Sequence, residues 1–186
     1  PGLRVLMPAT VTDARDMFIS AVLCKDPVVF IDDRWLYDQI DVLGPIEEKN
    51  IDEFKPKVMR YGSDVTIAST SFSTKLALEV SEKLTEENIE AEVIDIRTLN
   101  PFSPETLVES VEKTGRLVAI DGSWKNSGFS SEIISSVYES VPIEKLLSKP
   151  IRITLAECAA PTSSALEKIY YPSVESAINQ VKKVFN

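Results

Sequence analysis

The lack of histidine sets the first limit on the chemistry that this chain can perform. Its 186 residues include two cysteines, Cys24 and Cys158, and no histidine. Histidine is the side chain whose ordinary pKa suits proton transfer near neutral pH, so a Ser-His-Asp or Cys-His catalytic set cannot be built from this chain alone. Two thiols are also too few for a four-thiolate zinc site. We interpret both cysteines as small apolar residues and expect a reducing compartment.

A serine-rich segment, Ser69-Thr70-Ser71-Phe72-Ser73, is one candidate binding loop. It lies between a predicted strand and a predicted helix, which is where open α/β sheets place ligand loops. Its backbone N–H groups could hold an anion at the N-terminus of the helix. The simpler interpretation, which we favour, is that the side chain of Ser71 or Ser73 caps the helix.

A second strand-to-helix loop runs from Asp121 to Phe129 and contains Trp124. An aspartate at the end of a strand can face a ligand, and a tryptophan in a loop can anchor a partner protein. The simpler interpretation, again favoured, is that Trp124 covers the end of the sheet while Asp121 caps the turn.

Two adjacent carboxylates, Asp32 and Asp33, end a predicted strand. Such a pair could bind a metal ion or act as an acid/base pair. Because Arg34 follows directly, we expect an ion pair instead. Neither the phosphate-binding pattern G-x-x-x-x-G-K-[ST] nor the dinucleotide pattern G-x-G-x-x-G occurs. We therefore predict no catalytic residue and no cofactor-binding residue in this chain.

Short β-rich segments alternate with segments of helical periodicity along the chain. The expected strands cover residues 3–7, 28–31, 64–69, 91–96, 116–120 and 151–155, and the expected helices cover 14–22, 74–84, 103–115, 130–141 and a last segment from 173. Thr12 or Asp13 is expected to cap the first helix, and Gly115 to end the third. This alternation predicts an α/β fold with a three-layer, mostly parallel sheet covered by helices on both faces.

An acidic segment from Asp38 to Lys57 divides the chain into two parts. It contains one glycine and two prolines and shows no sustained apolar period, so we interpret it as a linker or an irregular crossing segment. Residues 1–50 hold only two expected strands and one helix, so their apolar edges need a partner. Residues 51–186, about 135 in number, are enough to bury a core of their own.

The charge of the chain is strongly acidic, with 20 Lys and Arg against 29 Asp and Glu and a formal value of −9. This charge argues against a nucleic-acid partner, which needs a basic face, and suits docking onto a basic protein. No apolar run approaches the roughly 20 residues of a membrane-spanning helix, so no membrane partner is expected. Because the first residue is Pro1, we expect either a processed chain or a piece of a longer one.

Several segments, taken in order along the chain, match the pattern of one protein family. The most specific is Glu92-Val93-Ile94-Asp95-Ile96-Arg97-Thr98-Leu99-Asn100-Pro101, and the others are residues 1–8, Asp13-Ala14, 26–30, Leu36-Tyr37, 61–67, Trp124, Gly128-Phe129, Glu132-Ile133, Pro161 and 171–173. Together they resemble the β subunit of the thiamine-diphosphate-dependent 2-oxo acid dehydrogenases of pyruvate, branched-chain or acetoin type, within the transketolase superfamily. The resemblance covers essentially the whole chain.

The resemblance implies a division of the chain at the acidic segment. Residues 1–50 resemble the tail of a pyrimidine-binding α/β domain with the start of a linker, and residues 51–186 resemble a transketolase C-terminal domain. In the family, the glutamate that contacts the cofactor and the active-site histidine lie in the preceding half of the pyrimidine-binding domain. The magnesium and diphosphate site belongs to the α subunit or domain. The family's reaction is the oxidative decarboxylation of a 2-oxo acid with acyl transfer to lipoamide, whereas this chain alone is expected to be inactive and to bind no cofactor.

The resemblance also implies one metal site and several partners. Some members bind a monovalent cation at a helix-to-strand turn, whose positions here are Ala21, Val22, Cys24 and Asp26. Cys24 departs from the oxygen ligands that such a cation prefers. The implied partners are the α subunit or domain, a second copy of the chain in a dimer, and the dihydrolipoyl acyltransferase core. The compartment would be the cytoplasm or another reducing compartment such as the mitochondrial matrix.

Two other functions stay open at this point. The parent protein could be a transketolase or a deoxyxylulose-phosphate synthase, both of which transfer two-carbon units. Alternatively, the chain is a stand-alone, non-catalytic interaction module that assembles with a larger complex or regulates it. The short tail and the Arg97-Thr98-Leu99-Asn100-Pro101 run favour the dehydrogenase type. The 2-oxo acid and the oligomeric state do not follow from the residues.

Overall fold

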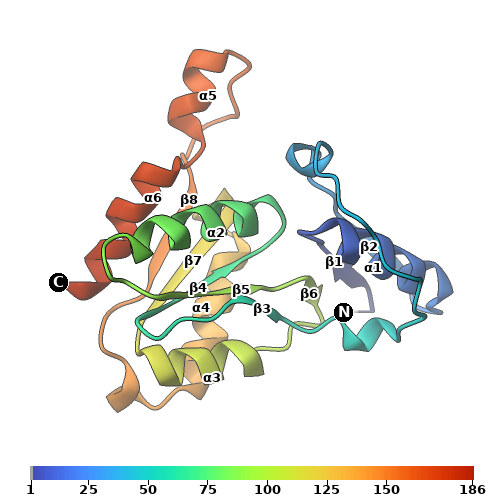
Figure 1. The fold of residues 1–186 in the computed structure, drawn as a ribbon, viewed down its shortest axis with the longest axis horizontal. Coiled ribbons are helices and arrows are strands. Elements are labelled where there is room, and N and C mark those ends of the chain that lie inside the picture. The colour runs from blue at the N-terminus through green and yellow to red at the C-terminus, as the bar shows by residue number, and fades with distance from the viewer. Residues whose placement is uncertain (1) are drawn as a thin grey trace.

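Two β-sheets organise the chain (Figure 1), and a computed structural model describes residues 2–186. The larger sheet contains β3 (Lys57–Arg60), β4 (Val65–Ser69), β5 (Ala91–Asp95), β7 (Leu117–Trp124) and β8 (Ile151–Leu155). Their spatial order is β3-β5-β4-β7-β8. The smaller sheet contains β1 (Arg4–Leu6), β2 (Val28–Phe30) and β6 (Thr98–Asn100), in the order β2-β1-β6.

The larger sheet is parallel except at one edge. β4 pairs in parallel with β5 on one side and with β7 on the other, and β7 pairs in parallel with β8. Every residue of β4 and β5 is buried, which is typical of parallel strands between two layers of helices. β3 pairs antiparallel with β5 and forms one edge of the sheet.

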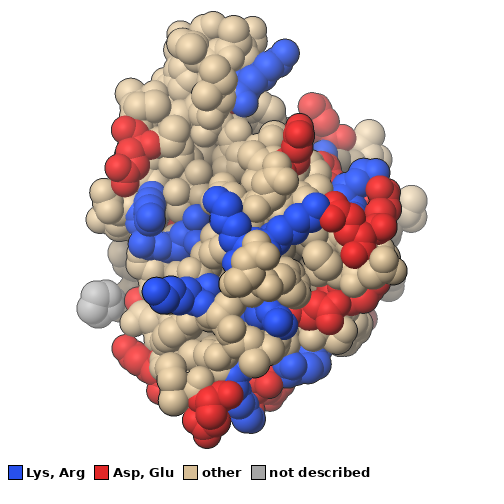
Figure 2. Space-filling view, turned by 90° about the vertical axis from the view of Figure 1, so that its left-hand side faces the viewer, with Lys and Arg blue, Asp and Glu red and all other residues tan. Residues whose placement is uncertain are grey.

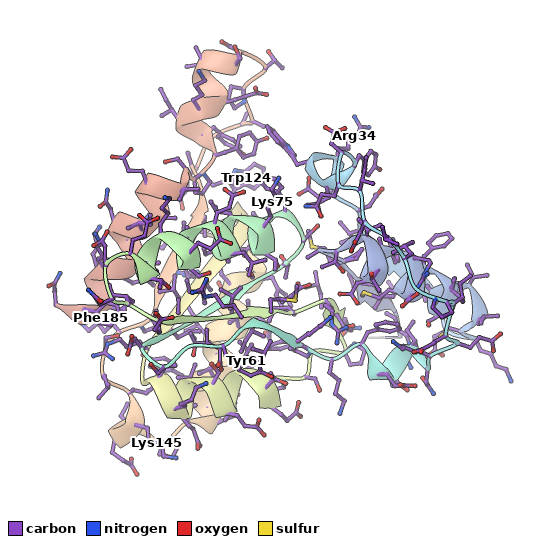
Figure 3. The ribbon with its side chains drawn as sticks, viewed as in Figure 1. Arg34, Tyr61, Lys75, Trp124, Lys145 and Phe185 are labelled. Atoms are coloured by element: carbon purple, nitrogen blue, oxygen red, sulfur yellow. The ribbon has the colours of Figure 1, made fainter. Side chains whose placement is uncertain are left out.

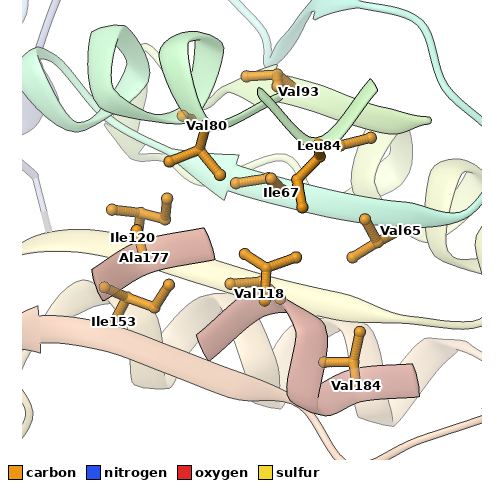
Figure 4. Close-up of a cluster of buried hydrophobic side chains, with 13 residues drawn as sticks. Val65, Ile67, Val80, Leu84, Val93, Val118, Ile120, Ile153, Ala177 and Val184 are labelled. Atoms are coloured by element: carbon orange, nitrogen blue, oxygen red, sulfur yellow. The ribbon is translucent and has the colours of Figure 1, made fainter. Parts of the chain in front are cut away.

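Helices cover both faces of the larger sheet, so the fold has three layers. α2 (Phe72–Thr85) and α6 (Val174–Val181) pack on one face, against alternate apolar residues of the strands such as Ile67 (Figure 4). α3 (Glu105–Thr114) and α4 (Phe129–Ser140) pack on the other face, against the intervening residues such as Ala68. The prediction of a three-layer, mostly parallel α/β sheet is confirmed.

The smaller sheet joins the two parts of the chain. β1 and β2 are parallel, and α1 (Val11–Leu23) connects them. β6 comes from much later in the chain and pairs antiparallel with β1. The buried side chains of Leu6, Met17, Ile51 and Phe54 form an apolar cluster separate from the two cores of the larger sheet. Residues on both sides of position 50 therefore share one core.

Several elements differ from the sequence expectations. β3, β6 and α5 (Ser164–Tyr170) were not expected, and α5 projects from the body of the molecule (Figure 1). The first helix begins earlier than predicted, because Thr10 rather than Thr12 or Asp13 is its cap: Asp13 N donates to Thr10 Oγ1 at 3.1 Å. Gly115 ends α3 as predicted, with a positive φ of 67° that glycine adopts without strain.

The acidic segment between the two parts is largely irregular, as predicted. Its regular pieces are a short 3-10 turn, Ile51–Glu53, and the first residue of β3. Asn50 and Glu53 form a capping box around this turn. None of the helices in the described part of the chain is long and apolar enough to cross a membrane.

Candidate functional site

The start of α2 and the second half of β7 lie next to each other at the carboxyl ends of the parallel strands. A Cβ atom placed on Gly122 would lie 3.5 Å from Ser73 Oγ. The end of β5 is adjacent, because Ile96 N donates a hydrogen bond to the carbonyl oxygen of Ser69 at 2.9 Å. The two loops that the sequence pointed to therefore form one edge of the sheet, where open α/β folds place their ligands.

The serine-rich loop does not cap α2 through a side chain, which corrects the expectation for Ser71 and Ser73. Ser71 takes the cap position with φ 49° and ψ −127°, and its side chain makes no hydrogen bond to the helix. Its hydroxyl group is buried and has no partner among the described residues. A backbone turn holds the start of the helix instead, since Thr74 N donates to Ser71 O at 2.9 Å.

A chain of buried polar groups leads from this loop to Asp95. Ser69 Oγ donates to Thr74 Oγ1 at 3.1 Å, and Thr74 Oγ1 donates to Asp95 Oδ1 at 3.1 Å. Asp95 is fully buried, and its Oδ2 has no hydrogen-bond partner within the described chain. Burial, together with the neighbouring carboxylate of Asp13, raises the pKa of Asp95 to about 7.

Arg97 links the two parts of the chain beside this carboxylate. Its Nη1 donates to Asp13 Oδ1 at 3.2 Å, and its Nε donates to the carbonyl oxygen of Lys55 at 2.8 Å. Its own carbonyl oxygen accepts a hydrogen bond from Met7 N at 2.7 Å. Sequence reasoning did not find this contact, because Asp13 and Arg97 are 84 positions apart and no local spacing relates them.

Asp121 lies within β7, which continues to Trp124 and so extends past its predicted end at residue 120, and its carboxylate holds the turn that leads to α4. Its Oδ1 accepts a hydrogen bond from Ser123 N at 3.1 Å, and its Oδ2 accepts one from Ser130 N at 2.7 Å. Ser130 lies in the first turn of α4, so the negative charge of the carboxylate also stabilises the N-terminal end of that helix. A Cβ on Gly128 would lie 2.8 Å from Asp121 Oδ2, so only glycine leaves room for this arrangement. Both carboxylate oxygens serve the turn.

Trp124 lies at the base of α5 and is about half exposed (Figure 3). Its Nε1 lies 3.1 Å from Tyr170 Oη and 3.2 Å from the carbonyl oxygen of Cys158. The indole group therefore ties the end of β7 to the segment around α5. Sequence reasoning pointed to Trp124, but not to the tyrosine that holds it.

A series of aromatic contacts continues from this point to the first part of the chain. The rings of Tyr170 and Tyr171 lie 4.9 Å apart, centre to centre. The ring of Trp35 lies 5.6 Å from that of Tyr171 and 5.5 Å from that of Phe72. Aromatic residues from three distant segments therefore pack together where the two parts of the chain meet.

The carboxylate pair Asp32-Asp33 makes no ion pair with Arg34 within the described structure, and the expectation of one was wrong. Asp33 Oδ1 accepts a hydrogen bond from Trp35 N at 3.0 Å and so begins a short 3-10 turn. The Asp32 carboxylate accepts a hydrogen bond from the hydroxyl group of Tyr37, which raises the pKa of that tyrosine. The two carboxylates thus have different partners and do not act as a pair.

The four positions of the expected cation site lie at the end of α1 and in the turn that leads to β2. Ala21 and Val22 belong to the last turn of the helix, where backbone carbonyl groups have no helical partner. Asp26 is already engaged, because Arg4 Nε lies 2.8 Å from its Oδ2. Asp26 N also donates to Cys24 Sγ at 3.3 Å. The cation site stays a prediction.

The two cysteines have different surroundings. Cys24 is partly buried and packs against the apolar cluster of the smaller sheet, as an apolar residue would. Cys158 is exposed, contrary to that interpretation. Both are free thiols.

A surface hollow of about 890 Å³ lies between the end of β6 and the start of α4. It is lined by Asn100, Phe102, Phe129 and Glu132, among others, and Glu132 is the one ionisable residue in its lining. A single carboxylate beside serine and phenylalanine side chains does not make a nucleophile with its base. Across residues 2–186, no three Cys, Asp or Glu side chains lie close enough together to hold a metal ion.

Comparison with solved structures places this architecture in the transketolase class. A split-gene transketolase, described as an inactive β4 tetramer, matches with a TM-score of 0.76 and 25% sequence identity. The match covers 99% of this chain and 57% of that chain. A family model for the C-terminal domain of transketolase matches residues 55–177, which is more than half of the chain. The chain belongs to the family of transketolase C-terminal domains.

Curated relatives narrow the similarity to one kind of subunit. The β subunit of the pyruvate dehydrogenase E1 component from Rickettsia bellii is 36% identical over 99% of this chain and 56% of the relative. The mitochondrial subunit from Caenorhabditis elegans is 35% identical over 100% of this chain, and the Bacillus subtilis subunit is 31% identical over 99%. The family resemblance stated from the sequence is confirmed. The chain spans about half the length of these relatives.

Proposed function

We propose that this chain is the C-terminal, assembly-related part of the β subunit of a thiamine-diphosphate-dependent 2-oxo acid dehydrogenase, and that it is not catalytic by itself. The observation that carries the proposal is the 36% identity to a pyruvate dehydrogenase E1 β subunit across 99% of the chain. The parent enzyme would decarboxylate a 2-oxo acid oxidatively and pass the acyl group to lipoamide. Residues 1–50 are then the tail of the pyrimidine-binding domain, and residues 51–186 are the C-terminal domain.

The cofactor of such an enzyme does not fit the residues of this chain. A magnesium ion needs several oxygen ligands, and residues 2–186 gather no three acidic or thiol side chains around one point. Both oxygens of Asp121, a carboxylate in the second half of β7, accept hydrogen bonds from backbone N–H groups. We therefore assign the magnesium and diphosphate site to an α subunit or domain and derive no catalytic step from this chain.

Assembly is the role that remains for the chain in this proposal. Its partners would be the α subunit, a second copy of the chain in a dimer, and the dihydrolipoyl acyltransferase core. The charge is not spread evenly over the surface: one face carries a central band of Lys and Arg, with Asp and Glu gathered toward its right-hand and lower edges (Figure 2). A basic partner would therefore dock on the acidic margins rather than on this band. We propose a reducing compartment, consistent with two free thiols.

A monovalent cation at Ala21, Val22, Cys24 and Asp26 belongs to the same proposal. The free carbonyl groups in the last turn of α1 support it, whereas the Arg4 guanidinium competes for Asp26. The test is the thermal midpoint of unfolding in potassium chloride and in choline chloride at equal ionic strength. A rise that is specific to potassium and is lost in Asp26→Ala supports the site, and equal midpoints in both salts reject it.

A second candidate function is a stand-alone, non-catalytic assembly module of the transketolase class. The matching transketolase structure, described as an inactive β4 tetramer, favours keeping this candidate. In that case the chain would associate with itself or with a larger complex and never take part in an active enzyme.

Reconstitution separates the two candidates. The chain is mixed with a pyruvate dehydrogenase α subunit and with the part of the β relative that it does not span, and the reduction of an artificial electron acceptor by pyruvate, a branched-chain 2-oxo acid or acetoin is measured. The dehydrogenase proposal expects activity in the complete mixture and none from the chain alone. A stable complex that is inactive with every substrate supports the module instead.

A further inference from the structure

The smaller sheet meets the larger one at Arg97. This residue lies between β5 and β6, where the chain passes from one sheet to the other (Figure 1). Its carbonyl oxygen accepts a hydrogen bond from Met7 N at 2.7 Å, and its guanidinium group lies 3.2 Å from Asp13 on α1. Its backbone has a φ of 61°, which residues other than glycine adopt at a cost and keep only where their contacts hold them. The contacts of Arg97 with Met7 and Asp13 form the junction of the two sheets.

A second carboxylate approaches the junction from the side of the larger sheet. Asp95 is the last residue of β5, and its side chain is fully buried. Its Oδ1 accepts a hydrogen bond from Thr74 Oγ1 at 3.1 Å, whereas its Oδ2 has no partner within the described chain. Asp13 Oδ2 is also buried and has no partner among the described residues. Each side of the junction therefore contributes one carboxylate whose hydrogen bonding is incomplete.

One cation serves both carboxylates. The charge of Asp13 opposes the ionisation of Asp95, and the guanidinium group of Arg97 favours it. That guanidinium group already pairs with Asp13 Oδ1 and donates through Nε to the carbonyl oxygen of Lys55 at 2.8 Å. If both carboxylates are ionised, the buried junction holds two negative charges and one positive charge.

The other charged groups on the neighbouring elements do not correct this imbalance. On α1, Asp16 pairs with Arg15 at 2.7 Å. Lys57 of β3 lies opposite Asp95 in the sheet, but its side chain is exposed, and so is that of Lys75, the first charged residue of α2. The strand β4 carries no charged residue. A bound proton on Asp95 is therefore the simplest way to balance the junction.

Ionisation of Asp95 would disturb the contacts around it. A buried negative charge beside a like charge is costly unless water or a cation reaches it. Water can reach Asp95 Oδ2 only if the packing around it opens, and Arg97 can turn toward Asp95 only by giving up Asp13. Either response weakens the attachment of α1 to the end of β5.

We propose that the junction is a proton-dependent contact: α1 and the smaller sheet stay packed against the end of β5 while Asp95 is protonated, and loss of this proton loosens them. Burial and Asp13 raise the pKa of Asp95 to about 7. In the loosened form water reaches the carboxylate, whose pKa then returns toward about 3.9. The contact therefore weakens as the pH rises from about 4 to about 7 and changes little above that range. This inference is independent of the proposed function.

The three methionines of the chain report on its parts separately. Met7 lies at the junction, Met17 is buried in the core of the smaller sheet, and Met59 packs against a core of the larger sheet. The chain is labelled with ¹³C-methyl methionine and titrated between about pH 4.5 and pH 8.5. The methyl signals of Met7 and Met17 are expected to shift with one common midpoint near the pKa of Asp95, about 7. That of Met59 is expected to move less than about one tenth as far.

Hydrogen exchange separates loosening from a change of charge alone. The protection factor of the Met7 amide, which corrects for the pH dependence of exchange itself, is expected to fall at least about tenfold between pH 5 and pH 7.5. Ile67 in the central strand β4 provides the reference amide. At pH 7.5 it should stay at least about tenfold more protected than Met7, because the junction opens without unfolding the larger sheet.

Matched variants assign the response to Asp95. Asp95→Asn has nearly the same shape and cannot ionise, so both the methyl titration and the loss of protection should disappear. Asp13→Asn removes the like charge and frees Arg97, so the response should remain, with its midpoint at least about half a pH unit lower. Lys57→Gln removes the exposed cation opposite Asp95 and should leave the midpoint within about 0.3 units. Circular dichroism verifies that each variant keeps the fold.

Four results would overturn the inference. The first is a methyl signal of Met17 that does not titrate, and the second is a titration that persists in Asp95→Asn. The third is a Met7 amide whose protection stays constant while the methyl signals shift, since the proton would then change a charge and not a contact. The fourth is equal protection of Met7 and Ile67 at pH 7.5, which would show that the junction opens only when the whole chain unfolds.

Discussion

Replacing Asp95 by asparagine is expected to remove a pH-dependent loss of stability from the folded chain. Burial and the Asp13 carboxylate raise the pKa of Asp95 to about 7, against about 3.9 for an exposed aspartate. The folded state therefore holds this proton more tightly than the unfolded chain, and the free energy of unfolding falls as the pH rises from about 4 to 7. The gap of about three pH units corresponds to about 4 kcal/mol above pH 7.

Asparagine has nearly the same shape as aspartate and cannot carry its charge. The amide oxygen can keep the hydrogen bond that Asp95 Oδ1 accepts from Thr74, and the amide NH₂ group would replace Oδ2, which has no partner in the described chain. The charged groups nearby are Asp13 on α1 and Arg97 just after β5, and they act in opposite directions on the pKa. An uncharged side chain removes the repulsion from Asp13 and leaves the pair between Asp13 and Arg97 in place.

Urea unfolding between pH 4 and pH 9 measures this effect. Asp95→Asn is expected to match the unsubstituted chain within about 1 kcal/mol at pH 4 and to be more stable by up to about 4 kcal/mol at pH 8. Asp38→Asn, at an exposed position of the acidic segment, serves as the control and should follow the unsubstituted chain throughout. Parallel curves for Asp95→Asn and the unsubstituted chain, or a less stable Asp95→Asn at pH 8, would refute the reasoning.

Three further substitutions test separate contacts. Gly128→Ala puts a Cβ atom 2.3 Å from a backbone carbonyl oxygen and should lower the free energy of unfolding by about 2 kcal/mol or more, measured by thermal unfolding. Gly44→Ala is the control: a Cβ atom there has nothing within 4 Å, and the free energy of unfolding should change by less than about 0.5 kcal/mol. Lys113→Met removes the ammonium group that pairs with the buried carboxylate of Glu92. Burial raises the pKa of Glu92, and the hydrogen bond from Lys113 helps to lower it. This change should cost about 1–2 kcal/mol at pH 7, and the difference should shrink at acidic pH as the carboxylate becomes protonated. A pH-independent difference would contradict this explanation. Trp35→Ala should lower the free energy of unfolding in urea by about 1–2 kcal/mol and speed hydrogen exchange where the two parts of the chain meet. Unchanged exchange in that region would show that the aromatic contacts of Trp35 do not join the two parts.

The central strands could be predicted from the sequence because their signal is local. β4, β5 and the first half of β7 are short runs rich in Val, Ile and Ala between polar turns, although β4 includes Thr66 and Ser69 and β5 includes Glu92 and Asp95. Such runs are typical of parallel strands that are buried on both faces. The end of α3 was equally clear, because Gly115 is the kind of residue that adopts a left-handed conformation at the end of a helix. Asp121 could be assigned to its turn for a similar reason, since its partners lie within nine positions of it.

The edge strands could not be predicted, because their partners are remote. β3 has four residues and β6 has three, too few to show a period of their own. β6 becomes a strand only because β1, more than 90 positions earlier, offers it an edge. The same holds for the link between Asp13 and Arg97, which are 84 positions apart and come together only when the two sheets are placed side by side. Contacts of this kind depend on the tertiary packing, so no short segment of the sequence predicts them.

The first helix shows where a local pattern and the packing of the chain differ. Apolar residues recur at helical spacing in this segment, yet α1 buries Asp13, Asp16 and Ser20 together with Met17 and leaves Phe18 exposed. Most of these buried polar groups have partners inside the chain: Arg97 binds Asp13 Oδ1, Arg15 binds Asp16, and Ser20 donates to a backbone carbonyl group, whereas Asp13 Oδ2 has no partner among the described residues. These hydrogen bonds and ion pairs stabilise the packing of this side of α1 on the rest of the chain.

The outward side of α1 carries Phe18 and Val22, whose side chains are largely exposed. Apolar side chains in contact with water do not stabilise the helix. Burying the side chains of Phe18 and Val22 would each contribute about 1.5–3 kcal/mol, which is a substantial share of the stability of a domain of this size. Exposed to water, these two side chains contribute little of this stabilisation to the chain.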